Sequence, residues 1–396
     1  MHKFDVPPLI ATEYAHLDLS VKIDKISSFV VRAPIEVPVV NAFGVMRDRP
    51  ALLLQVHSEI GEIGVGETWC NFPTCGAEHR ARLIETAISP LLIGVTFSSP
   101  ADCFHQLTNK LRLLAVQTGE YGPIAQCLAG IDIALWDLVA RRHGLPLYRL
   151  FGGKGVEVNA YASGINPTDA AETAARARAQ GYRAFKLKIG FGETIDMPNI
   201  EAMADDLGSN EWLMVDANQA WSAAEALRMI DLIQDFPIKW LEEPIVATAS
   251  TADWLQLAAA SSIDLAGGEN LFETTAFEGA AAGTWLNVIQ PDMCKWGGFS
   301  GTVPIARLIR RSGKLYCPHF LGGGVGLSAS AHLLAAIGGD GLLEVDCNVN
   351  PLRSQVFEPV LLEGKTSLPT GPGLGIDPAL LIQLHQEFKS SQAGFP

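Results

Sequence analysis

A repeated alternation of short apolar runs with Ala-rich helical segments after residue 154 constrains the fold more than any other feature of the sequence. Eight such runs follow one another, and the segments between them are long enough to form crossover helices. Because parallel strands need such crossovers, eight strand–helix units predict an α/β barrel rather than an open sheet. The runs cover residues 157–164, 184–190, 212–218, 238–244, 263–270, 285–293, 314–320 and 341–346.

The chain before the first of these runs has a different pattern. Residues 22–57 alternate as extended segments, whereas 79–94 and 122–144 carry apolar residues at helical spacing. This mixture predicts an α+β domain, and the C-terminal tail lacks the barrel rhythm and is expected to return to that domain. The expected division is 1–153 for the N-terminal α+β domain, 154–346 for the barrel with the catalytic residues, and 347–396 for the returning segment.

Charge and cysteine content restrict the partners and the compartment. The chain has 29 Lys plus Arg against 43 Asp plus Glu, a net charge of −14, whereas nucleic acids and anionic membranes require basic surfaces. Seven cysteines without CxxC pairing are atypical of a disulfide framework or zinc site and favour a reducing compartment. The first twenty residues lack a basic start followed by an apolar run, as a signal peptide would have. We therefore expect a cytoplasmic protein that binds neither nucleic acid nor membrane.

Charged and polar side chains stand where the apolar runs end. In a barrel of this kind, catalytic groups lie at the C-terminal ends of the strands. Successive groups are separated by one strand–helix unit, so they should converge on one mouth. They are Lys186, Lys188, Asp216, Asn218, Glu242, Glu269, Asp292, Lys295, His319 and Glu344.

Three of these groups, Asp216, Glu242 and Glu269, are carboxylates on successive units. Taken singly, each could be a helix cap or a solvated turn residue. Burying three carboxylates together is costly unless a cation neutralises them, and an all-oxygen ligand set suits Mg²⁺. Calcium and manganese accept the same ligand types. The repeated placement favours a metal site over three separate caps.

Two other groups are candidates for proton transfer. Lys186 and Lys188 lie two residues apart on a strand, so both face the same side and each disfavours protonation of the other. The resulting lower pKa is what a general base requires, although a salt-bridged surface pair is the alternative. His319 could be a structural core histidine, but a carboxylate one strand away, Asp292, could fix its tautomer and raise its pKa.

Together, these motifs resemble the enolase superfamily and, within it, the mandelate racemase subgroup (the mandelate racemase/muconate lactonizing enzyme family). The resemblance implies an N-terminal capping domain over a modified TIM barrel, (β/α)7β or (β/α)8, and a homo-oligomer. Members use a Lys or His base beside Mg²⁺, which stabilises an ene-diolate. The motifs occur in the family's order: GIDIALWD, FKLKIG, MVDANQAW, WLEEP, GGEN, QPDMCKWGG, PHF and LLE.

The resemblance implies catalytic roles for five residues. Lys188 would be the base on one face of the substrate's α-carbon, with Lys186 as the neighbour that lowers its pKa and contacts the substrate carboxylate. His319, paired with Asp292, would be the base or acid on the opposite face. Glu344 would donate a hydrogen bond to the enolate oxygen. In the muconate cycloisomerase subgroup a lysine stands in the position of Asp292, so Asp292 and His319 separate the two subgroups.

The same resemblance implies a metal and further contacts with the substrate. Asp216, Glu242 and Glu269 would be the Mg²⁺ ligands. Asn218 and Lys295 match polar positions that line the same site. The expected substrate is a small carboxylate.

With bases on both faces, the sequence allows two reactions. Loss of a β-hydroxyl would make a sugar acid dehydratase, which we place first, and reprotonation from the other face would make a 2-hydroxy acid racemase or epimerase. A non-catalytic binding protein on the same fold is the alternative from another class, which retention of every catalytic group disfavours.

Capping-domain loops are expected to set the specificity of the site. The candidates are residues 40–47, with Phe43 and Met46, and residues 69–72, with Trp69 and Phe72 as substrate contacts. Their apolar character would suit an aromatic or apolar 2-hydroxy acid. Simple packing of the cap on the barrel would explain it equally well.

Overall fold

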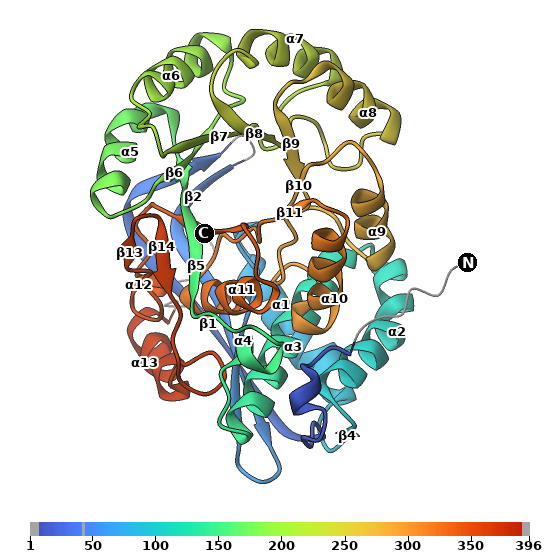
Figure 1. Ribbon diagram of the computed structural model, residues 1–396. Coiled ribbons are helices and arrows are strands. Elements are labelled where there is room, and N and C mark those ends of the chain that lie inside the picture. The colour runs from blue at the N-terminus through green and yellow to red at the C-terminus, as the bar shows by residue number, and fades with distance from the viewer. Residues whose placement is uncertain (1–7, 42–43, 390–396) are drawn as a thin grey trace, which may run out of the picture.

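Eight parallel strands form the barrel of the computed structural model, which describes residues 8–41 and 44–389 (Figure 1). Every predicted apolar run contains one strand, so the predicted barrel is confirmed. The hydrogen-bonded order runs from β11 through β10, β9, β8, β7 and β6 to β5, which also pairs with β12. No ladder joins β11 to β12 in the described part of the chain, which leaves an open seam there. The strands are β5 (Glu157–Ile165), β6 (Ala184–Lys188), β7 (Trp212–Asp216), β8 (Ile238–Glu242), β9 (Asp264–Gly267), β10 (Val288–Ile289), β11 (Leu315–Tyr316) and β12 (Leu342–Asp346).

Amphipathic helices surround the barrel, and Figure 1 shows α5 to α9 following one another round its outside. Helix α7 illustrates why they form. Ser222 caps its N-terminus in a reciprocal capping box with Glu225, and its buried residues, among them Ala226, Met229 and Ile233, make one apolar stripe. The helices are α5 (Ala170–Ala179), α6 (Glu193–Asp205), α7 (Ala223–Ile233), α8 (Thr251–Ala260), α9 (Thr274–Ala282), α10 (Gly298–Arg311), α11 (Gly324–Ile337) and the short α12 (Pro351–Ser354).

The alternation of side chains along each strand separates the packing surface from the barrel interior. In β6, Phe185 and Leu187 belong to the large core that includes the surrounding helices, whereas Ala184 joins the interior cluster. That cluster also contains Tyr161 and Trp240, whose rings meet edge to face at 5.6 Å. Apolar side chains therefore fill the middle of the barrel.

The N-terminal part of the chain is an α+β domain, as predicted. Its antiparallel sheet has the order β3-β2-β1-β4, and helix α3 packs against β3. This packing is very close, because a Cβ on Gly64 would lie 1.9 Å from the carbonyl oxygen of Ala134 and one on Gly130 would lie 2.2 Å from Thr68 Oγ1. The elements are β1 (Val21–Asn41), β2 (Gly44–Ser58), β3 (Ile63–Thr68), β4 (Thr96–Phe97), α1 (Gly76–Leu83), α2 (Pro100–Thr118), α3 (Tyr121–Arg142) and α4 (Leu147–Leu150), with short 3-10 or π turns at Thr12–Tyr14, Ile84–Ile88, Ser89–Leu91 and Pro167–Asp169.

Helix α3 is long and apolar enough to cross a membrane by length and composition. In this fold, however, 89% of its apolar window is buried inside the protein. Its apolar character is therefore explained by its position as the central packing element between the capping sheet and the barrel.

The C-terminal segment contacts both parts of the fold. The hairpin of β13 (Leu361–Leu362) and β14 (Lys365–Ser367) extends the barrel sheet by pairing antiparallel with β5. Helix α13 (Pro378–Phe388) lies against the capping sheet, where Gln55 Nε2 donates to the carbonyl oxygen of Pro378 at 2.7 Å. The segment limits at residues 153 and 346 stay predictions.

A buried carboxylate of α3 attaches the capping domain to the barrel. Asp132, only 1% exposed, accepts hydrogen bonds from Ser300 N at 2.9 Å and Ser300 Oγ at 2.5 Å, in the first turn of α10. Trp136 Nε1 donates to the same Ser300 hydroxyl at 2.8 Å. The motif GIDIALWD therefore contributes interface contacts rather than catalytic groups.

Replacing Asp132 with Asn should alter how the stability of the protein depends on pH. Burial raises the pKa of Asp132 from 3.8 to about 7, against the opposing effect of the Ser300 contacts. The stability that a raised carboxyl pKa contributes is complete below the unfolded pKa and is lost as pH rises through the folded pKa. Between about pH 4.5 and 7.5, the free energy of unfolding should fall by roughly 3 kcal/mol more in the wild type than in Asp132→Asn. Urea denaturation at both pH values measures this; equal losses would contradict it.

Candidate active site

A cavity of about 390 Å³ lies between the C-terminal ends of the barrel strands and the capping domain. Eight of the twelve predicted site residues line it, and the other four are buried behind them; Lys186, Asp216 and Asp292 contact lining groups, and Glu242 contacts Lys186. The lining residues that were predicted are Trp69, Phe72, Lys188, Asn218, Glu269, Lys295, His319 and Glu344; those behind them are Lys186, Asp216, Glu242 and Asp292.

Lys186 is the centre of a buried ion-pair network. Its Nζ lies 2.6 Å from Glu242 Oε1, 2.8 Å from Glu344 Oε1 and 3.6 Å from Asp216 Oδ2. Lys188, two residues further along β6, places its Nζ 2.5 Å from Asp216 Oδ2. The carboxylates come from β7, β8 and β12, so four strand ends meet at these two ammonium groups.

The charge state of Lys188 differs from the sequence prediction. Burial lowers the pKa of Lys188, and Lys186 lowers it further, but the carboxylates of Asp216, Glu242 and Glu344 together outweigh both effects and the net direction is upward. The predicted effect of the neighbouring lysine is thus present, while the predicted fall in pKa is wrong for this arrangement. The reason is the group of carboxylates from other strands, of which Asp216 on the next strand contributes most.

His319 is held at both ring nitrogens. Nδ1 lies 2.8 Å from Asp292 Oδ2, and Nε2 contacts the carboxylate of Glu269. The other oxygen of Asp292 accepts the backbone amides of Cys294 and Lys295 at 2.8 and 3.1 Å, which fixes the orientation of that carboxylate. Burial opposes protonation of His319, but Glu269, Glu344 and Asp292 raise its pKa well above the ordinary value. The predicted pairing and the predicted upward shift are both present.

Glu344 is an acceptor in this structure rather than the expected donor. Its oxygens accept hydrogen bonds from Ser163 Oγ at 2.5 Å and from Phe320 N at 3.1 Å. Burial raises its pKa, but Lys186 and His319 reverse the shift and hold the pKa of Glu344 at about 2. The expectation of a protonated Glu344 is therefore wrong here, because two cations face a single carboxylate.

The three expected metal ligands are buried at the ends of three successive strands. Asp216 and Glu242 are paired in register on β7 and β8, and Glu269 follows the end of β9. Each is 1 to 7% exposed and faces a cation of the chain: Lys188, Lys186 and His319 respectively. Within residues 8–41 and 44–389, no three metal-ligating groups are gathered into a cluster. The all-oxygen donor set fits Mg²⁺ in its chemistry, provided that the ion displaces these ammonium and imidazole partners.

Of the expected substrate contacts, Trp69 and Phe72 belong to the capping domain, whereas Asn218 and Lys295 belong to the barrel. Lys295 Nζ sits 4.9 Å from the centroid of the Trp69 ring, and the ring centroids of Phe72 and Trp69 are 6.5 Å apart. Met46 is 6% exposed and is not among the lining residues, which favours the packing alternative for this residue. Phe43 lies outside the described residues.

Several polar residues of the site were not assigned a role from the sequence. Gln290 Nε2 donates to Glu242 Oε2 at 2.6 Å, and Asn270 Nδ2 donates to Glu269 and Glu243. Burial raises the pKa of Glu243 well above its ordinary value, with the Glu269 carboxylate adding to the shift. The end of the first apolar run supplies Ser163, and Asn166 follows that run. The unassigned lining residues with polar side chains are Ser163, Asn166, Gln219, Asn270 and Asp346.

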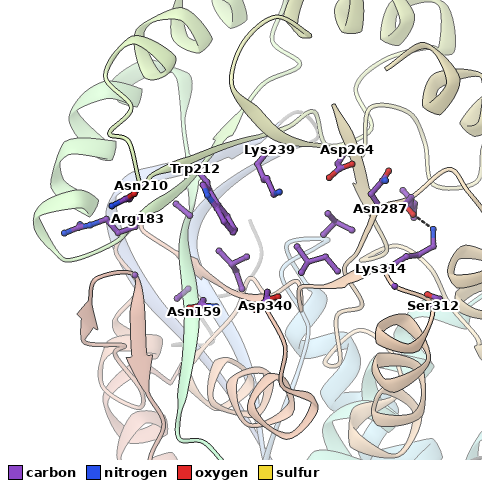
Figure 2. A pocket seen from close by; sticks show the side chains of 18 of the residues that line it. Asn159, Arg183, Asn210, Trp212, Lys239, Asp264, Asn287, Ser312, Lys314 and Asp340 are labelled. Carbon is purple, nitrogen blue, oxygen red and sulfur yellow. Dashed lines mark hydrogen bonds between the residues drawn. The ribbon is translucent and has the colours of Figure 1, made fainter. Parts of the chain in front are cut away.

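A larger cavity, of about 1130 Å³, opens at the opposite, N-terminal ends of the strands and contains none of the predicted residues (Figure 2). The basic groups that line it, Arg183, Lys239 and Lys314, are already partnered. Lys239 Nζ lies 5.2 Å from the ring of Trp212, and Lys314 donates to the carbonyl oxygen of Leu286. Catalytic groups of such barrels lie at the other end, so this cavity is not the candidate active site.

The sequence matches two family models that together cover most of the chain: the mandelate racemase/muconate lactonizing enzyme N-terminal domain over residues 25–152, and the enolase C-terminal domain-like family over residues 169–380. The chain therefore belongs to the enolase superfamily and to its mandelate racemase/muconate lactonizing enzyme family.

Named relatives include enzymes of several activities. A D-galactarolactone cycloisomerase of Agrobacterium fabrum is 32% identical over 374 residues, covering 90% of this chain and 96% of the relative. An L-talarate/galactarate dehydratase of Salmonella typhimurium is 33% identical, covering 68% of this chain and 67% of the relative. An N-succinyl-L-Arg/Lys racemase of Bacillus cereus is also among the relatives. The chain is thus an enolase-superfamily lyase or isomerase.

Solved structures agree with this assignment. A mandelate racemase/muconate lactonizing enzyme of Bordetella bronchiseptica superposes with a TM-score of 0.87 at 47% identity, covering 92% of this chain and 99% of that chain. A racemase of Streptomyces coelicolor with bound magnesium has a TM-score of 0.81 at 25% identity, covering 91% of this chain and 99% of that chain. The capping domain and barrel are therefore those of the superfamily.

Proposed function

We propose that this enzyme removes the α-proton of a small carboxylate and that its reaction is the dehydration of a sugar acid. The observation that carries the proposal is the placement of two proton-transfer groups on opposite sides of one mouth. Lys188 ends β6 and His319 follows β11, and β7 to β10 separate these strands on one side while β5 and β12 separate them on the other. Both side chains line the same cavity.

Lys188 is the proposed base for the α-proton. Its Nζ would take the proton and leave an electron pair that moves into the substrate carboxylate, forming an enolate with a second negative charge. Lys186, fixed among three carboxylates, would keep a positive charge beside that developing charge. Lys188 must first lose a proton, which requires that its ion pair with Asp216 be broken.

His319 is the proposed acid for the leaving group. Asp292 holds Nδ1, which leaves Nε2 directed at Glu269 and the cavity. From the imidazolium, Nε2 would protonate the β-hydroxyl as the enolate collapses, so that the carbon–oxygen bond breaks and water leaves. The enol product would then tautomerise to a 2-keto acid.

Asp216, Glu242 and Glu269 would hold Mg²⁺. Bound there, the cation would stabilise the second negative charge on the substrate and compete with Lys188 for Asp216. A relative structure with bound magnesium and the buried oxygen donor set support this assignment.

Racemisation or epimerisation of a 2-hydroxy acid is the second candidate. It uses the same two groups but needs no leaving hydroxyl, because His319 would return the proton to the opposite face. The apolar lining residues Trp69, Phe72 and Leu321 favour it, since polyol hydroxyls that faced these side chains would lack hydrogen-bonding partners there. Two relatives, an L-talarate/galactarate dehydratase and an arabinonate dehydratase, support the sugar acid instead.

Mass spectrometry, with polarimetry to follow configuration, tests the proposal on a panel of sugar acids and 2-hydroxy acids incubated in D₂O with the enzyme and Mg²⁺. We expect at least one sugar acid to lose one molecule of water, and His319→Asn to form none of that product. A change of configuration without loss of mass would replace dehydration by racemisation. Absence of both reactions and of α-proton exchange across the panel would contradict the proposed function.

The other expectations for this protein stay predictions. They are the homo-oligomeric state, the cytoplasmic location and the absence of nucleic-acid or membrane partners. A small-molecule carboxylate is the proposed partner of the mouth cavity.

A further inference from the structure

The backbone that follows His319 is held by side chains from several parts of the fold. Phe320 N donates to Glu344, and Asn350 Nδ2 donates to the carbonyl oxygen of Gly322 at 2.8 Å. The capping domain supplies the remaining contacts. Asn71 Nδ2 donates to the carbonyl oxygen of Leu321 at 2.6 Å, and the Glu67 carboxylate accepts the amides of Gly323 and Gly326 at 2.5 and 2.8 Å.

Glu67 is buried at the interface of the two domains. It lies near the end of β3, is 2% exposed, and reaches the first turn of α11, where free amides favour an anion. The glycines opposite allow this approach, because a Cβ on Gly322 or on Gly323 would lie 2.9 Å from Glu67 Oε1. The Gly322–Gly324 sequence thus makes room for a carboxylate from another domain.

His319 needs such support because the barrel gives its loop little. Strand β11 has only two residues, Leu315 and Tyr316, and pairs with β10 alone among the described strands. The side facing β12 is the open seam of the barrel. The contacts of Glu67 and Asn71 lie beyond that short strand and restrain the segment that a second ladder would otherwise restrain.

An electrostatic interaction links Glu67 to the pair formed by His319 and Asp292. Burial raises the pKa of Glu67 to about 7; the amides of Gly326 and Gly323 oppose the shift, and the Asp292 carboxylate adds to it. The thiols of Cys70 and Cys294 are the other titratable groups that face it. Glu67 therefore lies close enough to the His319–Asp292 pair to interact with the charge of Asp292.

We propose that Glu67 is a positioning residue for the reaction: from the capping domain, its carboxylate fixes the loop that carries His319 and so sets the alignment of that side chain with the substrate. Asn71 contributes to the same restraint through Leu321. The inference rests on the proposed function in one respect, that His319 transfers a proton on one face of the substrate. Glu67 itself does not line the cavity.

Glu67→Gln tests the inference, because the amide NH₂ of Gln would face a backbone N–H in place of one carboxylate oxygen. Asp196→Asn is the matched control. Asp196 is likewise a buried carboxylate that accepts two backbone amides, those of Gly190 and Phe191, but in the loop after Lys188. The two readouts are amide hydrogen exchange of residues 318–328 by mass spectrometry and α-proton exchange measured separately for the two substrate configurations.

In Glu67→Gln we expect faster amide exchange in 318–328 and a roughly tenfold to hundredfold lower rate of α-proton exchange on the His319 face, with the Lys188 face within about twofold of the wild type. Asp196→Asn should leave 318–328 and the His319 face unchanged. If Glu67→Gln does not fold, Asn71→Ala carries the same readouts. Unchanged amide exchange in 318–328, or equal losses on both faces, would overturn the inference.

The amide-exchange measurement needs no substrate, so the positioning role of Glu67 and the proposed function can fail separately. A wild type that neither releases water nor exchanges the α-proton would contradict the proposed function. Faster amide exchange in Glu67→Gln would then still support the restraint of the loop, and unchanged exchange would overturn it.

Discussion

Replacing Glu269 with Gln is expected to lower turnover by roughly 10³-fold or more, because Mg²⁺ would lose one of its three anionic ligands and the substrate's second negative charge would lose its main stabilisation. The nearby cations hold the pKa of Glu269 well below the ordinary value despite its burial, so the substitution removes a full charge. Titration calorimetry with Mg²⁺ and steady-state rates over a range of Mg²⁺ concentrations would measure both effects. Chelation should abolish the activity of the wild type in the same way.

Glu243 provides a matched control for this substitution. It is a buried carboxyl group of the same site but not one of the expected metal ligands; burial and the Glu269 carboxylate raise its pKa well above the ordinary value, and Gln is nearly isosteric with it. We expect Glu243→Gln to bind Mg²⁺ within about tenfold of the wild-type affinity. Equal loss of Mg²⁺ binding in both variants, or unchanged binding in Glu269→Gln, would contradict the ligand assignment.

Replacing either proton-transfer group is expected to stop chemistry on one face of the substrate only. Lys188→Ala and His319→Asn should each lower the affected half-reaction by roughly 10²–10⁴-fold and leave the other group able to exchange its own proton. Proton NMR in D₂O, with each configuration of the substrate supplied separately, measures the two half-reactions.

A second buried histidine controls for the loss of the ring itself. His332 is fully buried between α4 and α11, where Nδ1 accepts the amide of Tyr148 at 3.2 Å and burial lowers its pKa to about 3. His332→Asn should keep both half-reactions, provided that it folds. The two-base assignment fails if His319→Asn retains full turnover, or loses exchange on both faces while still binding Mg²⁺.

The positions of the site residues could be predicted from the sequence because strand ends repeat once in each strand–helix unit. That regularity brought Lys188, Asp216, Glu269 and His319 to one mouth as expected. It carries no information on which charges become neighbours across the barrel. Lys186 and Glu344 come from strands far apart in the chain, and their 2.8 Å contact makes Glu344 an acceptor rather than a donor.

Contacts between the domains lie further beyond the reach of sequence reasoning. Glu67 and Gly323 are 256 residues apart, and neither belongs to a strand end of the barrel. Taken alone, the Gly322–Gly324 sequence indicates only a break between elements of secondary structure. Its role in admitting a carboxylate from β3 depends on the close docking of the capping domain, which no local pattern predicts.

Exchange of the substrate's α-proton with solvent deuterium, followed by proton NMR with Mg²⁺ and again after chelation, tests the central claim most directly. The account predicts loss of the α-proton signal from at least one 2-hydroxy or 2,3-dihydroxy carboxylate when Mg²⁺ is present, and retention of that signal after chelation. Turnover that leaves the α-proton in place, or exchange that continues unchanged after the metal is removed, would contradict it.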